Sequence, residues 1–251
     1  MREDLKRIMV IAHRGSSAIA PENTISAFKQ AVIEGSDIIE LDVHQSKDGV
    51  VLCIHDEELS RTTTGKGKVI NFTFEELKLF DAGVKFSQKF KGETIPSLEQ
   101  VLEEIKLPIL IEIKNATGYY PEIEQNIINL LKKHNSINRC IIQSFENSIL
   151  FKIRELNDQV ELHKLVLGNL PIVPFHIDNK LKRGEITEYS NVKAINPNHK
   201  FLSKNLVDQI HKNGQKVFTW TVDDESDMIK VIGFGVDGII TNYPDRLLNL
   251  L

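Results

Sequence analysis

Cysteine is scarce in this sequence, because Cys53 and Cys140 are the only two among 251 residues. Both lie in apolar runs typical of strands, so we expect buried thiols and no disulfide framework. A chain of this length can bury a large core without covalent cross-links. The scarcity excludes the disulfide-rich secreted class and favours a reduced compartment.

Long apolar runs are also missing. No stretch approaches the roughly 18 consecutive apolar residues that a membrane-spanning helix needs. Near the N-terminus, the apolar run at 8–12 is far shorter than the core of a secretory signal, and it continues directly into His13. We therefore predict a cytoplasmic protein with no integral membrane segment.

Charge of one sign is not in large excess either. The formal net charge is -4, and charged residues make up 26% of the chain. A nucleic-acid partner would require a strongly basic surface, whereas a small anionic ligand needs only local positive charge. We expect a small-molecule partner and no nucleic acid, and the oligomeric state stays open.

Apolar runs typical of strands alternate with amphipathic segments along the chain. The runs cover residues 7–13, 37–44, 108–114, 139–144, 160–167, 192–196, 216–222 and 237–241. Strands that alternate with helices favour a parallel sheet, and right-handed crossovers close it into a (β/α)8 TIM barrel. The alternative is an open, doubly wound sheet, but Gly15-Ser16-Ser17 is a poor match to its glycine-rich loop. We expect one domain over 1–251.

Helix signals fill the gaps between these strands. Asn23 or Thr24 caps the first helix, and Ser97 with Gln100 forms a capping box. Apolar residues recur at helical spacing in each segment. The predicted helices cover 24–34, 97–105, 121–134, 146–156, 203–214 and 225–234.

The connection after the second strand, at about 45–96, is long for a βα loop. Asp48-Gly49 lies between two apolar runs and predicts a tight hairpin. Thr73 with Glu76 predicts a short capped helix. We expect a small insertion, which is either a lid over the site or a structural cover.

Phenylalanines are concentrated in this insertion. Clustered aromatic side chains are more often packed together than exposed, which favours a small core within the insertion. The alternative is an apolar groove beside the site. The residues concerned are Phe72, Phe74, Phe80, Phe86 and Phe90.

Three carboxylates are candidates for a metal site. Side chains on a strand alternate between faces, so Glu40 and Asp42 point the same way. Glu112 ends an almost wholly apolar strand, where a charge is costly unless it is paired or metal-bound. Carboxylate oxygens suit one divalent cation, Mg2+ or Ca2+, with Mn2+ also compatible. The alternatives are solvated strand ends for the pair and a salt bridge to Lys114 for Glu112.

Two histidines and two cations complete the candidate site. His13 ends the first strand, and the hairpin returns His55 to the side of residues 40–42. Imidazoles beside carboxylates suit a general base and a general acid near neutral pH. Arg14 offers a planar fork that matches phosphate oxygens, and Lys114 adds a second positive charge. For the histidines and Arg14, the alternative is a solvated surface position.

Short motifs in a fixed order extend over nearly the whole chain. They are His13-Arg14-Gly15, Pro21-Glu22-Asn23-Thr24, Glu40-Leu41-Asp42-Val43, Asp48-Gly49, His55-Asp56, Glu112-Ile113-Lys114, Gln143-Ser144-Phe145, Trp220-Thr221-Val222 and Asp237-Gly238-Ile239-Ile240-Thr241-Asn242. Together they resemble the glycerophosphodiester phosphodiesterase family, of the bacterial cytoplasmic type. No single motif is decisive, but the ordered set is highly specific.

The resemblance implies metal-dependent hydrolysis of glycerophosphodiesters to an alcohol and sn-glycerol 3-phosphate. In the family's usual mechanism, a glycerol hydroxyl attacks phosphorus and gives a cyclic phosphate that water later opens. The implied roles are metal ligation by Glu40, Asp42 and Glu112, acid-base catalysis by His13 and His55, and phosphate binding by Arg14 and Lys114.

Several other residues have weaker expectations. Trp220, the only tryptophan, either packs against the glycerol or alcohol part of the substrate or belongs to the core. Hydrogen bonds around the ligands are expected from Glu22, Asn23 and Gln143. His44 is expected to be solvated. The remaining histidines lack acidic companions at a useful spacing along the chain, namely His134, His163, His176, His199 and His211.

Other functions stay open because a fold does not fix a function. A metal-dependent isomerase or aldolase would have no strict need for His55. A noncatalytic phosphate-ester binding barrel would usually lack a histidine or a metal carboxylate, which this chain retains. Among phosphodiesterases, a lysophospholipase-D-like activity on acylated substrates is the main alternative. The sequence does not fix the preferred alcohol.

Overall fold

Eight parallel strands form a closed barrel in the computed structural model, which describes residues 7–114, 119–167, 189 and 191–251. They pair in the order β1-β9-β8-β7-β6-β5-β4-β2, and the pairing of β1 with β2 closes the ring. This confirms the (β/α)8 TIM barrel. The strands are β1 (Met9–His13), β2 (Ile38–Gln45), β4 (Ile109–Ile113), β5 (Cys140–Ser144), β6 (Glu161–Val166), β7 (Ala194–Pro197), β8 (Lys216–Thr219) and β9 (Gly238–Thr241).

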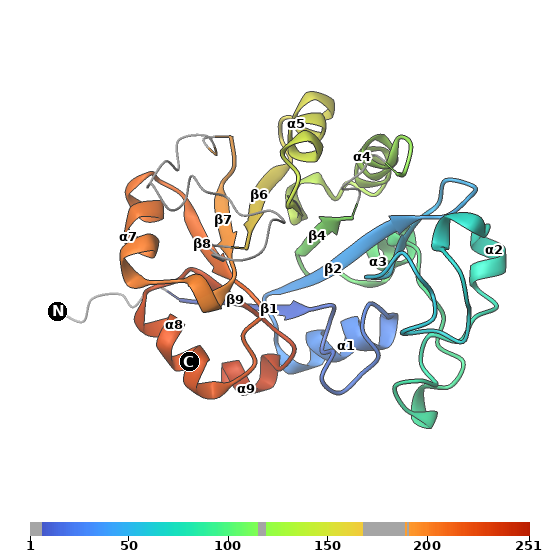
Figure 1. Ribbon diagram of the computed structural model, residues 1–251, viewed down its shortest axis with the longest axis horizontal. Coiled ribbons are helices and arrows are strands. Elements are labelled where there is room, and N and C mark those ends of the chain that lie inside the picture. Colours follow the sequence, from blue (N-terminus) through green and yellow to red (C-terminus); the bar gives the residue numbers. More distant parts are fainter. Residues whose placement is uncertain (1–6, 115–118, 168–188, 190) are drawn as a thin grey trace, which may run out of the picture.

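Helices surround the strands as an outer ring (Figure 1). The caps expected at Thr24 and Ser97 are present, and the Ser97 hydroxyl accepts from the backbone N–H of Gln100. The C-terminal helix was not predicted, although Pro244 at its first turn is a favourable start. The helices are α1 (Ile25–Glu34), α3 (Leu98–Glu104), α4 (Ile123–Lys133), α5 (Asn147–Leu156), α7 (Lys204–Lys212), α8 (Glu225–Gly233) and α9 (Pro244–Leu248).

Alternating side chains divide the core into an outer and an inner layer. On β1, Val10 and Ala12 belong to the large cluster between the strands and the helices. Ile11 belongs to a second cluster with Leu110 and Phe218, which come from other strands and fill the inside of the barrel. A barrel of this size has a packed interior of such layers and no pore.

The same alternation places charged residues on the inner face of β2. Ile38 lies in the inner cluster and Ile39 in the outer one. Glu40 and Asp42 follow at intervals of two, so they share the inner face with Ile38. They therefore lie beyond the apolar cluster that fills the inside of the barrel, toward the carboxyl ends of the strands.

The insertion begins with the predicted hairpin. β3 (Val51–Cys53) pairs antiparallel with β2, and Val43 lies opposite Cys53. The chain continues through η1 (Val69–Asn71), α2 (Phe74–Leu77) and η2 (Gln88–Phe90). The predicted capping box of Thr73 and Glu76 opens α2.

A small apolar core holds the insertion together. Its buried members include Leu52, Leu59 and Leu77. Three of the insertion's phenylalanines pack against it, namely Phe72, Phe74 and Phe80. The packed-core interpretation is therefore correct for these three.

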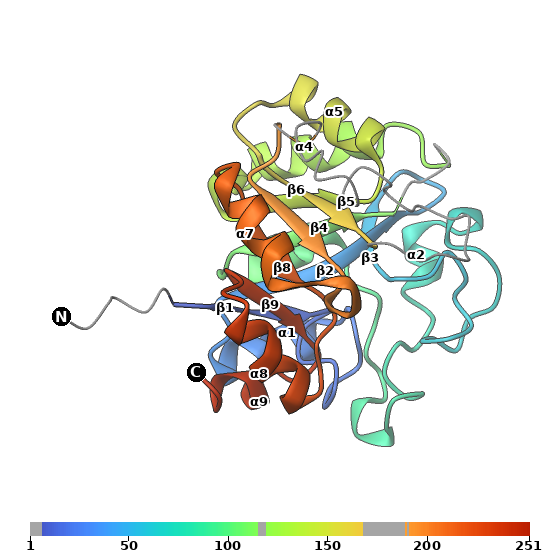
Figure 2. The same ribbon diagram turned by 60° about the vertical axis from the view of Figure 1, so that its left-hand side comes forward.

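The insertion lies at the end of the barrel toward which the strands run (Figure 2). The C-terminus lies at the opposite end (Figure 2). Within the described part of the chain, no helix is both long and apolar enough to cross a bilayer. The single domain over 1–251 stays a prediction.

Candidate active site

Three buried carboxylates meet at the carboxyl ends of neighbouring strands. Strand register places Asp42 beside Glu112 and His13 beside Glu40. Glu40, Asp42 and Glu112 each contribute an oxygen to a group whose atoms all lie within 4.8 Å of one another. The expected convergence of the three acids is therefore present.

Two cations face these carboxylates. Arg14 Nε lies 3.0 Å from Asp42 Oδ2, and Lys114 Nζ lies 2.6 Å from Glu112 Oε1. Lys114 also lies 3.1 Å from the other oxygen of Asp42. Lys114 therefore forms the salt bridge to Glu112 that was the alternative to metal ligation, and the two cations leave one of the three carboxylates uncompensated.

The protonation states of the acids follow from this imbalance. Burial, with Asp42 and Glu112 close by, raises the pKa of Glu40 well above its ordinary value. Burial also acts on Asp42, but the charges of Lys114 and Arg14 hold its pKa below the ordinary range. Like charges packed this closely cannot all ionise without further positive charge.

A divalent cation fits this donor set. Three carboxylates on rigid strands offer the hard oxygen ligands that Mg2+, Ca2+ and Mn2+ accept. Two positive charges would compensate the unbalanced carboxylate and leave the site with a net positive charge. Such a site would attract an anionic phosphodiester.

His13 is held by a chain of hydrogen bonds. Its Nδ1 lies 2.7 Å from Oδ1 of Asn242. The amide nitrogen of Asn242 donates to Asp223 at 2.7 Å, which turns the amide oxygen toward the imidazole. His13 therefore carries its proton on Nδ1, and Nε2 keeps a free lone pair.

Burial and the adjacent Arg14 lower the pKa of His13 to about 4, although Asp42 opposes the shift. The imidazole is therefore neutral near pH 7, as a general base requires. Asn242 belongs to a motif noted in the sequence, but its contact with His13 was not predicted. Asp223 was missed entirely, because no local pattern marks it.

His55 is oriented by its neighbour in sequence. Its Nδ1 lies 2.6 Å from Oδ1 of Asp56. The other oxygen of Asp56 accepts from Nε of Arg61. Burial lowers the pKa of His55, although Asp42 and the hydrogen bond to Asp56 oppose that shift.

Glu22 links the two halves of the site. Its carboxylate accepts from Arg14 at 2.8 Å and from both terminal nitrogens of Arg61 at 2.7 Å. Arg14 belongs to the loop after β1, whereas Arg61 belongs to the insertion. Sequence reasoning missed Arg61 because its contact with Glu22 joins residues 39 positions apart.

Asn23 supports Asp42 with both ends of its amide. Its nitrogen donates to Asp42 Oδ2 at 3.0 Å, and its oxygen accepts from the backbone N–H of Asp42 at 3.1 Å. Asn23 has a φ of 56° and Arg14 a φ of 58°, a left-handed conformation that is uncommon outside glycine. This turn lets the backbone N–H of Arg14 donate to Glu40 at 3.0 Å.

Gln143 supports Glu40 from within the barrel. Its amide nitrogen donates to Glu40 at 3.2 Å, and its oxygen accepts from Asn196 at 2.9 Å. Asn196 thereby fixes which end of Gln143 faces the carboxylate. Asn196 was not predicted, although an asparagine in an apolar strand is a usable signal.

Trp220 lies just beyond β8, because the strand expected at 216–222 ends at Thr219. Its indole nitrogen donates to the carbonyl of Asn196 at 2.7 Å. Its ring packs edge-on against Phe145, with ring centroids 5.6 Å apart. Trp220 also lines the cavity described next, so it has both a packing contact and a surface toward that cavity.

One cavity of about 170 Å³ collects most of the predicted site residues. Asp42, Glu22 and Asn23 are not among its lining residues. Asn23 contacts Asp42, and Glu22 contacts Arg14. The predicted residues that line the cavity are His13, Arg14, Glu40, His55, Glu112, Lys114, Gln143 and Trp220.

The expectation for His44 was wrong, because this residue is buried and not solvated. Its Nδ1 lies 2.7 Å from the hydroxyl of Tyr120, and its Nε2 donates to the carbonyl of His55 at 2.9 Å. Burial accordingly lowers the pKa of His44. Its position under the hairpin makes it a support for the backbone of His55.

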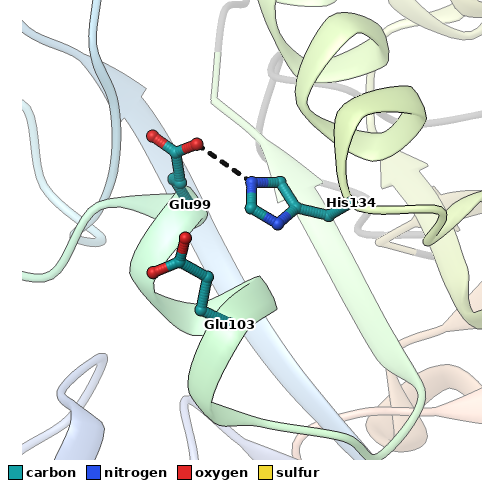
Figure 3. Close-up of side chains that lie close together, drawn as sticks. All are labelled: Glu99, Glu103 and His134. Carbon is teal, nitrogen blue, oxygen red and sulfur yellow. Dashed lines mark hydrogen bonds and ion pairs between the residues drawn. The ribbon is translucent and has the colours of Figure 1, made fainter.

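Four other histidines do have acidic partners in the fold, and three of these partners lie far away along the chain. The imidazole of His134 faces Glu99 at 2.9 Å, and Glu103 lies close by (Figure 3). Lys133 already pairs with Glu99 at 2.6 Å, so this second acidic group is balanced by a cation of its own. His176 lies outside the described residues. The other pairs are His163 with Glu161, His199 with Asp227, and His211 with Asp237.

The sequence is similar to one family of known proteins. Residues 13–246 match the model of the glycerophosphoryl diester phosphodiesterase family. The chain is 42% identical over 248 residues to a glycerophosphodiester phosphodiesterase of Caldanaerobacter subterraneus subsp. tengcongensis, with 98% of each chain covered. It is 34% identical over 245 residues to one of Bacillus altitudinis, with 96% and 97% covered.

The fold matches solved structures of the same kind. A phosphodiesterase of Oleispira antarctica, solved in complex with the product sn-glycerol-3-phosphate, superposes with a TM-score of 0.85 at 30% sequence identity. The alignment covers 96% of this chain and 95% of that one. The chain therefore belongs to the glycerophosphoryl diester phosphodiesterase family.

Proposed function

We propose that this glycerophosphodiester phosphodiesterase uses one divalent cation and two histidines to release an alcohol and sn-glycerol 3-phosphate from its substrates. The observation that carries the proposal is the charge imbalance of the site. Three buried carboxylates face two cations, and two of the carboxylates line the cavity together with both histidines. The related Oleispira antarctica enzyme, solved with sn-glycerol-3-phosphate, supports the choice of product.

Glu40, Asp42 and Glu112 would hold the cation. When bound, a divalent cation supplies Lewis acidity and neutralises charge that develops on the phosphoryl oxygens. Mg2+ or Ca2+ is proposed, and Mn2+ also suits carboxylate ligands. Arg14 and Lys114 would bind the remaining phosphate oxygens, because both line the cavity and both are held in place by carboxylates.

His13 would act as the base. Its free Nε2 takes the proton of a glycerol hydroxyl as that oxygen forms its bond to phosphorus. The neutral state of the imidazole near pH 7 and the fixed Nδ1 proton support this role. The attack would give a cyclic phosphate.

His55 would act as the acid. The bond between phosphorus and the alcohol oxygen breaks, and the proton of His55 passes to that oxygen. Asp56 stabilises the protonated imidazole through its contact with Nδ1. In the second half of the reaction the roles reverse, because water must lose a proton as it opens the cyclic phosphate.

Product release tests the proposal. Release of sn-glycerol 3-phosphate from glycerophosphocholine and glycerophosphoethanolamine would be measured with chelator and then with Mg2+ or Ca2+ restored. We expect chelation to stop release, one cation to restore it, and His55→Ala to abolish it. His134→Ala is a matched control, because this histidine lies in the balanced group around Glu99.

Two outcomes would contradict the proposal. Full activity in the presence of chelator, after dialysis against it, would exclude the cation. No release from either diester by folded protein would redirect the search to acylated lysophospholipids, the alternative substrates, and then to binding without turnover.

A further inference from the structure

A second cavity lies beside the one that holds the candidate site. It has a volume of about 260 Å³ and is formed by the loop after β1 and by the insertion. Its lining includes polar side chains, two cations and one exposed aromatic ring. The lining residues are Ser17, Pro21, Glu22, Arg61, Thr62, Ala82, Lys85 and Phe86.

Residues that line the second cavity contact the proposed catalytic groups directly or through one intervening side chain. Glu22 lines this cavity and accepts from Arg14, which lines the other one. Arg61 pairs with Asp56, which contacts His55. The hydroxyl of Ser17 donates to the carbonyl of His13 at 2.8 Å. The two cavities are therefore neighbours, linked by the contacts of Glu22, Arg61 and Ser17.

The proposed reaction indicates which part of the substrate would lie near the second cavity. The acid must lie beside the oxygen that leaves, so the alcohol extends from phosphorus on the His55 side. Asp56 and Arg61 lead from that imidazole to the second cavity. The alcohol part of a bound diester would therefore extend toward it.

Charge distinguishes the second cavity from a neutral groove. Glu22 is compensated by Arg14 and Arg61. Lys85 donates to the carbonyl of Ser60. Among the residues that the structure describes, no carboxylate forms an ion pair with Lys85, so its positive charge remains available to a ligand.

We propose that the cavity lined by Arg61, Lys85 and Phe86 receives the leaving alcohol, and that Lys85 favours alcohols with a negative charge over cationic ones. The inference rests on the proposed function and adds a substrate preference to it. Phe86 is 45% exposed and can cover the apolar face of a ring or polyol. An aromatic face also attracts quaternary ammonium groups, but the uncompensated charge of Lys85 opposes them.

Three substrates with different alcohol charges test the proposal. Glycerophosphocholine carries a cationic alcohol, glycerophosphoglycerol a neutral one, and glycerophosphoinositol 4-phosphate an anionic one. We expect kcat/KM of the unaltered enzyme to rise in that order. In Lys85→Glu, we expect the ratio of the choline substrate to the inositol phosphate substrate to rise by about tenfold or more, because the sign of a nearby charge is reversed.

Lys89→Glu is the matched control, because Lys89 lies on the same insertion but does not line the cavity. It makes the same change in net charge and should leave the ratio within about twofold of the original, because Lys89 does not line the cavity and solvent screens exposed charges. Lys85→Gln should give an intermediate ratio. Equal ratios in Lys85→Glu and Lys89→Glu would overturn the proposal, as would a preference of the unaltered enzyme for the choline substrate. Absence of turnover for all three diesters would instead overturn the proposed function.

Discussion

The guanidinium of Arg61 binds the carboxylate of Glu22 through two parallel hydrogen bonds of 2.7 Å each. Paired donors of this kind fix geometry as well as charge. Since the Nε of Arg61 also donates to Asp56, one side chain from the insertion holds the neighbours of both Arg14 and His55.

Replacement of Arg61 by lysine keeps the positive charge but cannot form the paired hydrogen bonds to Glu22. We expect Arg61→Lys to lower kcat by about tenfold to a hundredfold, because small displacements of catalytic groups are costly. Stability should fall by at most about 1 kcal/mol, as is usual for half-exposed ion pairs. Steady-state kinetics and urea unfolding would measure the two effects.

Arg7→Lys is the control for that substitution. Arg7 forms an exposed ion pair with Asp37, away from the residues that line the candidate site. It should leave kcat unchanged. Equal kinetic effects of Arg7→Lys and Arg61→Lys would show that Arg61 has no positioning role.

Asp223 orients His13 through Asn242. In Asp223→Asn, the new amide can turn a donor toward the Asn242 side chain, which removes the reason for its oxygen to face His13. We expect kcat to fall by about tenfold to a hundredfold with a smaller change in KM, since a misplaced base impairs the chemical step. Asp227→Asn, on α8 beside His199, should have no such effect. An unchanged kcat in Asp223→Asn would contradict the role.

Stabilisation by the cation should depend on Glu112. A ligand at about 100 times its Kd stabilises the native state by about 2.7 kcal/mol, and we expect a gain of this order when the chelated protein receives its cation. Glu112→Gln should lose most of that gain because it removes one of the three carboxylates. Urea unfolding with and without the cation would measure it. Glu103→Gln, from the acidic group shown in Figure 3, should retain the full gain.

His13 should make the chelated protein less stable in acid. Its pKa is about 4 in the folded protein against an ordinary value of 6.5, so the unfolded chain binds more protons between these values. Stability from this residue is present above pH 6.5 and is lost as the pH falls toward 4. Between pH 7 and pH 5 the loss should be about 2 kcal/mol.

The variant His13→Gln isolates that contribution. Its free energy of unfolding, measured in urea with chelator, should fall less between pH 7 and pH 5 than that of the unaltered protein. Groups away from the site titrate equally in both proteins, so the difference between the two slopes reports His13 and its coupling to Asp42. Parallel slopes would contradict the burial of a neutral imidazole.

Local sequence patterns were sufficient to predict the features that depend only on neighbouring residues. The period of two on β2 placed Glu40 and Asp42 on one face, and the Asp48-Gly49 turn returned His55 to them. Thr24 and the Ser97 box marked helix starts for the same reason, since a cap contacts residues within one turn.

Contacts between distant segments were not predictable in this way. Arg61 meets Glu22, which lies 39 positions earlier, and the imidazole of His44 meets Tyr120 across 76 positions. Both contacts depend on how the insertion and the helices close over the barrel. A histidine that looks solvated in sequence is therefore buried once a tyrosine hydroxyl can reach it.

The burial of Cys53 provides a way to measure the opening of the hairpin. The thiol lies on β3, opposite Val43, in the hairpin that carries His55, and burial raises its pKa well above the ordinary value. A thiol reagent can therefore modify Cys53 only when the hairpin separates from its surroundings. The rate at which Cys53 is labelled then reports the opening of the insertion, and the measurement needs no engineered cysteine.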